Sequence, residues 1–191
     1  MRKSVSQQDW GVHFNLGAFF AFVRRIAKSA GVAPRDALSA CYYFVLHHEI
    51  NHYEVDLGIF FLEAHSGQRQ YFLRKYPNEL EEGLGNGRGA SRPEVKEFKQ
   101  VIVNRYAKSS LLGYRDIKKY LRSRQQSEAF TEILFDAVPP LRYEFPLVHE
   151  FMKPGRPFNS KNIPIYFHLA GSLNNSPSNP PSNFVHQYTV L

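Results

Sequence analysis

Cysteine is almost absent from this chain, because Cys41 is the only one among 191 residues. A lone cysteine excludes an intramolecular disulfide and suits a reducing compartment. Long apolar runs are also absent: the run Leu16–Val23 is too short to span a bilayer and ends at Arg24 and Arg25. Polar residues interrupt the N-terminal segment where a signal peptide needs an apolar stretch. These absences predict a cytoplasmic protein with no membrane partner.

The sequence also has no internal repeat, no zinc-finger spacing, no aromatic-rich RNA-binding motif and no phosphate-binding glycine loop. Its formal net charge of +7 is uneven, since one segment holds many cations against a single acid, Asp116. These cations are Arg105, Lys108, Arg115, Lys118, Lys119, Arg122 and Arg124. Those at 108, 115, 119 and 122 recur at helical spacing and predict one basic helix face. That face is either solvated surface or a patch for nucleic acid or an acidic partner.

The hydrophobic content of 43% is sufficient for one folded domain, which we expect to span residues 1–171. Apolar periodicity and stop signals predict helices at Asn15–Gly31 and Ala33–Gly67, and a third helical region at 93–135 that breaks near Ser109–Tyr114. Short aromatic segments at 141–148 and 162–170 predict strands. The Ser-, Asn- and Pro-rich segment 172–191 is expected to be a flexible tail. The fold class is therefore α+β and mostly helical.

The segment FVLHHEINHYEVD, from Phe44 to Asp56, places histidines and carboxylates inside an expected core helix. Within it, His48, Glu49 and His52 have H-E-x-x-H spacing. Residues at i and i+4 lie one above the other on a helix, so the two imidazoles can converge on one cation. Glu49 would lie beside that cation, where it can take a proton from water. Two buried histidines without a partner would be costly, and a metal ion would remove that cost.

A catalytic zinc ion usually has three protein ligands, so a further residue is needed. Glu63 is excluded because it lies roughly 16 Å beyond His52 along the same helix. Asp56 is two turns beyond His48 and is better placed as a hydrogen-bond partner near His52.

The third ligand is expected in the segment PNELEEGLGNG, which begins at Pro77. Asn78 and Glu81 have the spacing of a capping box, which gives Glu81 an ordinary structural role. Glu82 has no such role and is chosen as the ligand, although a solvated first-turn acid is the alternative. Asn86, one turn later, can orient a ligating histidine. The glycines at 83, 85 and 87 are expected to let this helix approach the histidine helix and also to weaken it.

The pair of motifs HHEINH and LEEGLGNG resembles the gluzincin class of zinc metallopeptidases, in which a glutamate on the next helix completes an H-E-x-x-H site. The resemblance implies His48, His52 and Glu82 as zinc ligands, Glu49 as catalytic base and Asn86 as a supporting residue. The chain also resembles small bacterial proteins that pair an H-E-x-x-H helix with an E-E-A-L-A-N helix, although glycine replaces both alanines here. The resemblance covers Leu38 to Arg88.

These features predict a zinc-dependent hydrolase, with one Zn²⁺ per chain and a peptide or protein as substrate. The donor that would stabilise an oxyanion is left open among His149, His168, Tyr106, Tyr114 and Tyr143. Two other functions are also open. One is a nucleic-acid-associated module that uses Arg105–Arg124. The other is a toxin- or inhibitor-type interaction protein with a structural or degenerate metal site.

Overall fold

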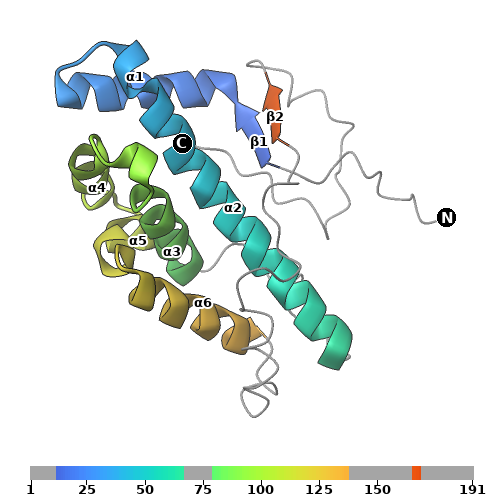
Figure 1. Ribbon diagram of the computed structural model, residues 1–191. Helices are drawn as coiled ribbons and strands as arrows, with labels where there is room; N and C mark the ends of the chain where they lie inside the picture. Colours follow the sequence, from blue (N-terminus) through green and yellow to red (C-terminus); the bar gives the residue numbers. More distant parts are fainter. Residues whose placement is uncertain (1–11, 67–78, 138–164, 169–191) are drawn as a thin grey trace.

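The computed structural model describes residues 12–66, 79–137 and 165–168 (Figure 1). These residues form a mostly helical α+β fold, as the sequence predicts, with two short strands beside the first helix. The strand expected at 162–170 is confirmed for its central part, β2, Ile165–His168. The strand expected at 141–148, the domain end at residue 171 and the tail 172–191 lie outside the described residues.

Strand β1, Val12–Asn15, leads directly into helix α1, Leu16–Ala30. The helix begins where the Asn15 side chain accepts a hydrogen bond from the backbone N–H of Ala18, at 3.1 Å. It ends at Gly31, whose φ of 71° is the left-handed conformation that favours glycine. Strand β1 pairs in parallel with β2, from Val12 opposite Ile165 to Asn15 opposite His168. The sequence analysis did not predict β1, because its partner lies near the other end of the chain.

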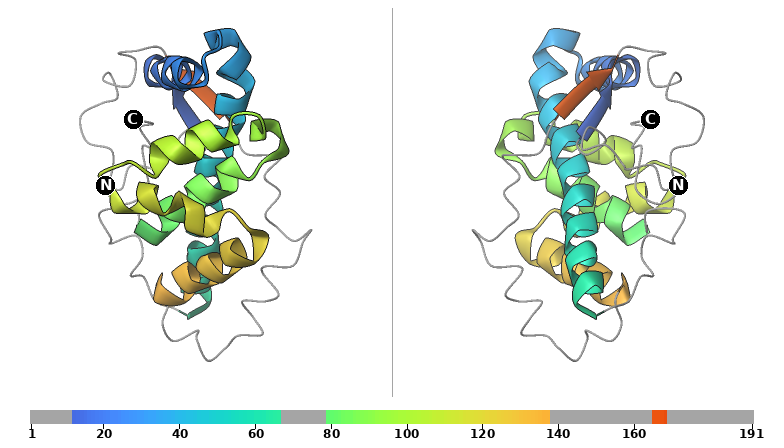
Figure 2. Two further views of the ribbon diagram at one scale, coloured as in Figure 1. Left: turned by 90° about the vertical axis from the view of Figure 1, so that its left-hand side faces the viewer. Right: turned by 90° about the vertical axis from the view of Figure 1, so that its right-hand side faces the viewer.

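Helix α2, Pro34–Ser66, is the long central helix, and α3 to α6 lie on one side of it (Figure 2). Its N-terminal half packs into a hydrophobic cluster that reaches Leu46, and its C-terminal half packs into a second cluster that begins at Val55. The polar segment from His48 to His52 lies between these two clusters. Among the described helices, none combines the length and apolar character needed to cross a membrane.

Helix α3, Glu79–Ala90, continues without interruption through all of its glycines, although these were expected to weaken it. The glycines allow close contacts on two faces of the helix. A Cβ atom at Gly89 would lie 2.4 Å from the Phe44 carbonyl oxygen of α2. A Cβ at Gly87 would lie 2.4 Å from the Tyr120 carbonyl oxygen on the opposite face. Tertiary packing therefore overrides the low helix propensity of glycine.

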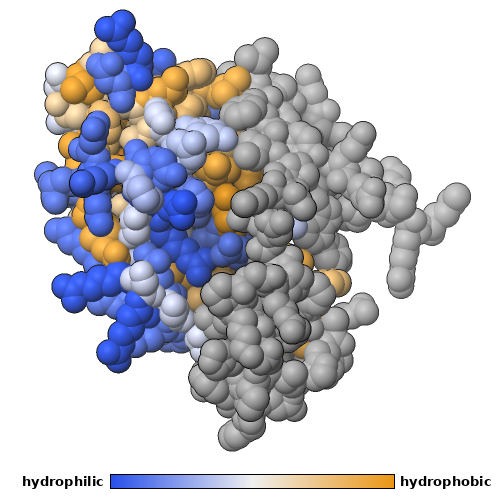
Figure 3. Space-filling view, viewed as in Figure 1, coloured by the Kyte–Doolittle hydropathy of each residue, from blue (hydrophilic) through white to orange (hydrophobic). Residues whose placement is uncertain are grey.

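The remaining described elements are short: η3, Pro93–Val95; α4, Lys99–Tyr106; α5, Leu112–Arg115; η4, Asp116–Tyr120; and α6, Ser123–Ala137. The predicted break near Ser109–Tyr114 is confirmed between α4 and α5. The predicted basic helix face is wrong, because its cations lie on different short elements and turns. Lys119 is also paired with Asp116 at 2.9 Å. The visible surface of these elements is mainly hydrophilic (Figure 3).

Candidate metal centre

The candidate metal centre lies between α2 and α3, which pack against each other in antiparallel directions. The close contacts between these two helices recur every four residues. Phe44 of α2 lies against Gly89 of α3, and the His48 ring lies against Gly85. One turn further along α2, His52 Nδ1 lies 2.6 Å from Glu81 Oε1. Side chains four residues apart share a helix face, so this register brings the polar segment of α2 onto the acidic first turn of α3.

His48, His52 and Glu82 converge so that one potential ligand atom from each lies within 4.8 Å of the other two. His48 Nε2 is 3.0 Å from His52 Nε2 and 3.5 Å from Glu82 Oε2. His52 Nε2 is 3.6 Å from Glu82 Oε1. Ligands about 2.1 Å from one ion at tetrahedral angles stand about 3.4 Å apart, so this spacing suits a zinc-sized cation.

Access to this cluster is uneven. The His52 side chain is fully buried, whereas 18% of the Glu82 side chain and 11% of the His48 side chain remain exposed. Glu82 and His48 therefore lie nearer the surface than His52 does.

His52 is held by Glu81, a carboxylate that is also fully buried. Burial by itself lowers the pKa of His52, but the hydrogen bond and charge of Glu81, with Glu82 and Glu49, raise that pKa to about 9. When the neutral ring donates its Nδ1–H to Glu81, the Nε2 lone pair points into the cluster. A carboxylate behind a ligating histidine fixes its tautomer and orientation in this way. Glu81 is therefore the hydrogen-bond partner that orients a ligating histidine. From the sequence, Asp56 and Asn86 were expected to support the histidines in this way.

His48 is the more neutral of the two imidazoles. Burial lowers its pKa well below the usual range, and the neighbouring His52 lowers it further, while Asn86 has the opposite effect. Asn86 is fully buried beside this ring, but neither its amide atoms nor His48 Nδ1 has hydrogen-bonding geometry with another described group. Since a histidine binds metal in its neutral form, the environment of His48 suits a ligand.

Glu49 is a buried carboxyl group, only 4% exposed, and its Oε2 has no hydrogen-bond partner among the described residues. Burial raises its pKa to about 7, and the charges of His52 and Glu82 act on it in opposite directions. A carboxyl group with this pKa is well matched to general acid–base chemistry near neutral pH.

Tyr114 connects the cluster to the next part of the molecule. Its side chain lowers the pKa of Glu82 and so opposes the rise that burial produces. Its ring centroid is 6.5 Å from that of His48 and 5.4 Å from that of Tyr106, on which it stacks. Burial and the charges of Glu82 and Glu49 raise the pKa of Tyr114, so the hydroxyl remains protonated and able to donate.

Other polar or reactive residues of α2 are not part of the cluster of potential ligands. The His47 ring stacks on Tyr43, with centroids 6.5 Å apart. Glu63 and Asp56 are not among the three convergent groups of the described residues. Cys41 is buried in the hydrophobic core. Of the remaining oxyanion candidates, His168 belongs to β2, while Tyr143 and His149 lie outside the described residues.

Sequence reasoning missed the contact between Glu81 and His52, because it assigned Glu81 to the helix start. The signal was nevertheless present as a four-residue repeat, Glu81, Gly85 and Gly89, on one face of α3. The two glycines mark the face that contacts α2, so the glutamate on the same face points toward α2 as well.

Comparison of this chain with protein-family models, curated proteins and solved structures gave no match. The resemblance to gluzincins therefore remains a hypothesis that rests on the residues of the site alone.

Proposed function

We propose that this chain is a zinc-dependent hydrolase, most simply a peptidase of the reducing cytoplasm. The observation that carries the proposal is the convergence of His48, His52 and Glu82 at spacings that suit one zinc ion, beside the buried carboxyl group of Glu49. The single cysteine is buried and forms no disulfide, which supports the proposal of a reducing compartment.

Each polar residue has a distinct part in this proposal. Zinc supplies Lewis acidity, which activates water near pH 7 and polarises a carbonyl group. His48, His52 and Glu82 would hold the ion, and Glu81 orients His52 through their 2.6 Å contact. Glu49 accepts a proton from the attacking water and returns it to the leaving nitrogen. Tyr114 supplies a protonated hydroxyl beside Glu82.

The test combines metal analysis with one active-site variant, Glu49→Gln. Glutamine has the shape of the glutamate, and a carboxyl group with a pKa of about 7 is half protonated at pH 7, so we expect the variant to fold. Wild type and variant should each bind one zinc per chain. Cleavage of a randomised library of fluorescence-quenched peptides should fall by about 10²- to 10⁴-fold in the variant, because general base catalysis is lost.

His47→Asn is the matched control, because His47 is adjacent to the motif but stacks on Tyr43 outside the cluster. It should retain both zinc and peptide cleavage. Folded wild-type protein that fails to bind zinc would contradict the metal assignment. Zinc-loaded protein that Glu49→Gln leaves fully active would contradict the catalytic assignment, and zinc binding without any hydrolysis would favour the interaction-protein alternative.

A further inference from the structure

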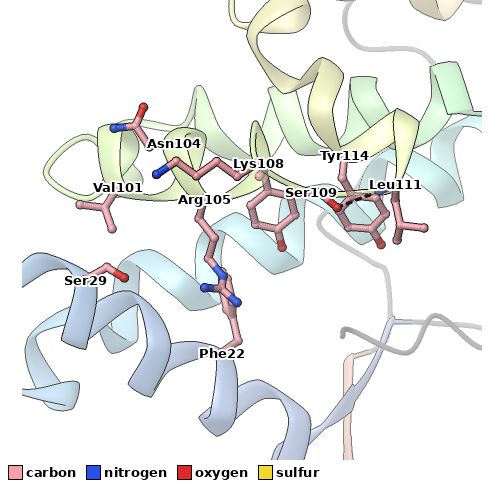
Figure 4. Close-up of a pocket in the computed structure, with 10 residues that line it drawn as sticks. Phe22, Ser29, Val101, Asn104, Arg105, Lys108, Ser109, Leu111 and Tyr114 are labelled. Atoms are coloured by element: carbon pink, nitrogen blue, oxygen red, sulfur yellow. Dashed lines mark hydrogen bonds between the residues drawn. The ribbon is translucent and has the colours of Figure 1, made fainter.

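A pocket of about 560 Å³ opens between α1 and the segment formed by α4, the following turn and α5 (Figure 4). Its size is in the range of small-molecule and side-chain binding sites. Arg105 and Lys108 contribute cations to its lining, and none of the described residues that line it is acidic. The Arg105 side chain extends across the pocket toward Phe22 of α1 (Figure 4).

The two cations are not neutralised by the described part of the protein. Both side chains are exposed, and no described carboxylate forms an ion pair with either of them. Elsewhere in the same basic segment, Lys119 is paired with Asp116 and Arg124 with Glu128. Arg105 and Lys108 are therefore available to an anion, and asparagine and serine side chains beside them add further polar groups.

The pocket also adjoins the candidate metal centre. Tyr114 lines the pocket, and its ring centroid lies 6.5 Å from that of His48. Its pKa also responds to the charges of Glu82 and Glu49, so this side chain lies near both the pocket and the metal centre. A ligand held by Arg105 and Lys108 would need to extend past Tyr114 to reach the metal centre.

We infer that this pocket binds a carboxylate of the peptide substrate, held by Arg105 and Lys108 while the scissile bond lies at the metal centre. The inference rests on the proposed function, since it assigns the anion to a peptide. Guanidinium and ammonium groups form charge-assisted hydrogen bonds with carboxylates. Because Tyr114 lines the pocket and its ring lies 6.5 Å from that of His48, cleavage is expected close to the carboxylate along the peptide. The carboxylate comes either from an acidic side chain or from a free C-terminus.

The first experiment measures binding without turnover. Zinc-loaded Glu49→Gln protein is titrated into three fluorescein-labelled decapeptides by fluorescence anisotropy. One contains only alanine and glutamine and has an amidated C-terminus, one replaces the glutamines with glutamates, and one keeps the alanine and glutamine side chains but has a free C-terminal carboxylate. We expect one of the two charged peptides to bind about tenfold more tightly than the neutral amide, and the preference to weaken as salt rises. The preferred peptide identifies the source of the carboxylate.

The second arm removes the pocket charges in the same background, with Arg105→Gln and Lys108→Gln combined. The matched control combines Arg115→Gln and Lys118→Gln, two exposed cations of the same segment that do not line the pocket. The tighter binding of the charged peptide should disappear in the variant that lacks Arg105 and Lys108, and it should persist in the control. The two proteins should have equal thermal stability. Equal binding of all three peptides, or an equal loss of preference in both proteins, would overturn the inference.

Cleavage sites mapped by mass spectrometry complete the test. Wild-type protein should cut at a constant position close to the preferred carboxylate, and the Arg105 and Lys108 substitutions should raise KM without lowering kcat. Selective binding in the absence of any cleavage would contradict the proposed hydrolase function while leaving the pocket assignment intact. Cleavage with no dependence on a carboxylate would contradict the pocket assignment alone.

Discussion

Gly85 lies at the point where α3 touches the imidazole of His48, so Gly85→Ala directly tests the geometry of the metal centre. An added Cβ would lie 3.0 Å from His48 Nδ1 and 3.2 Å from its Cε1. Unstrained contacts between heavy atoms are roughly 3.5 Å or longer, so the ring must retreat by a few tenths of an ångström. Metal–ligand distances tolerate only about 0.2 Å, so the displacement should weaken zinc binding by about tenfold or more.

The stability of the same variant should change little, because alanine gains up to about 1 kcal/mol of helix propensity, which offsets the tight contact. Gly87→Ala should instead lose stability and retain its zinc affinity. Its Cβ would lie 2.4 Å from the Tyr120 carbonyl oxygen, a backbone contact that cannot relax easily and should cost about 1–3 kcal/mol. Zinc affinity is measured by competition with a chromogenic chelator, and stability by urea unfolding of metal-free protein. Wild-type zinc affinity in Gly85→Ala would refute the reasoning, as would an equal loss of affinity in both variants.

Two further predictions concern buried groups. Glu81→Gln should weaken zinc binding by roughly ten- to a hundredfold, because the charged support behind His52 is lost. Chelator competition at pH 9.5 measures this loss, since proton competition is small above the His52 pKa of about 9, and unchanged affinity would contradict it. Burial raises the pKa of Cys41 to about 12, so the native thiol should react with a disulfide reagent at pH 8 about a thousandfold more slowly than the unfolded chain. Rapid modification of the folded protein would show that Cys41 is accessible.

The local features of the helices could be predicted because they depend on residues close together in the sequence. The apolar spacing from Leu16 to Ala30 and the stop at Gly31 are sufficient to define α1. The i, i+4 placement of His48 and His52 on one helix likewise follows from helical geometry. The break after Tyr106 was predicted for a similar reason, because the Ser- and Gly-containing segment that follows does not continue the helical pattern.

The glycines of α3 could not be interpreted correctly from the sequence. Their low helix propensity predicts a weak or interrupted helix, whereas the structure has an uninterrupted one. The reason is that each glycine admits a neighbour that the sequence does not identify: the His48 ring at Gly85, the Phe44 carbonyl group at Gly89, and Tyr120 at Gly83 and Gly87. The strand β1 was missed for the same kind of reason, because its hydrogen bonds go to β2 near the other end of the chain.

The different roles of Glu81 and Glu82 show most clearly what could not be predicted from the sequence. The order of residues is enough to place two acids in the first turn of α3 and two histidines on the preceding helix. Which acid turns toward His52 Nδ1 and which toward the two Nε2 atoms depends on the rotation of α3 against α2. That rotation is set by the close contacts of Gly85 and Gly89 with α2. Such contacts join residues some forty positions apart, so only the folded chain decides them.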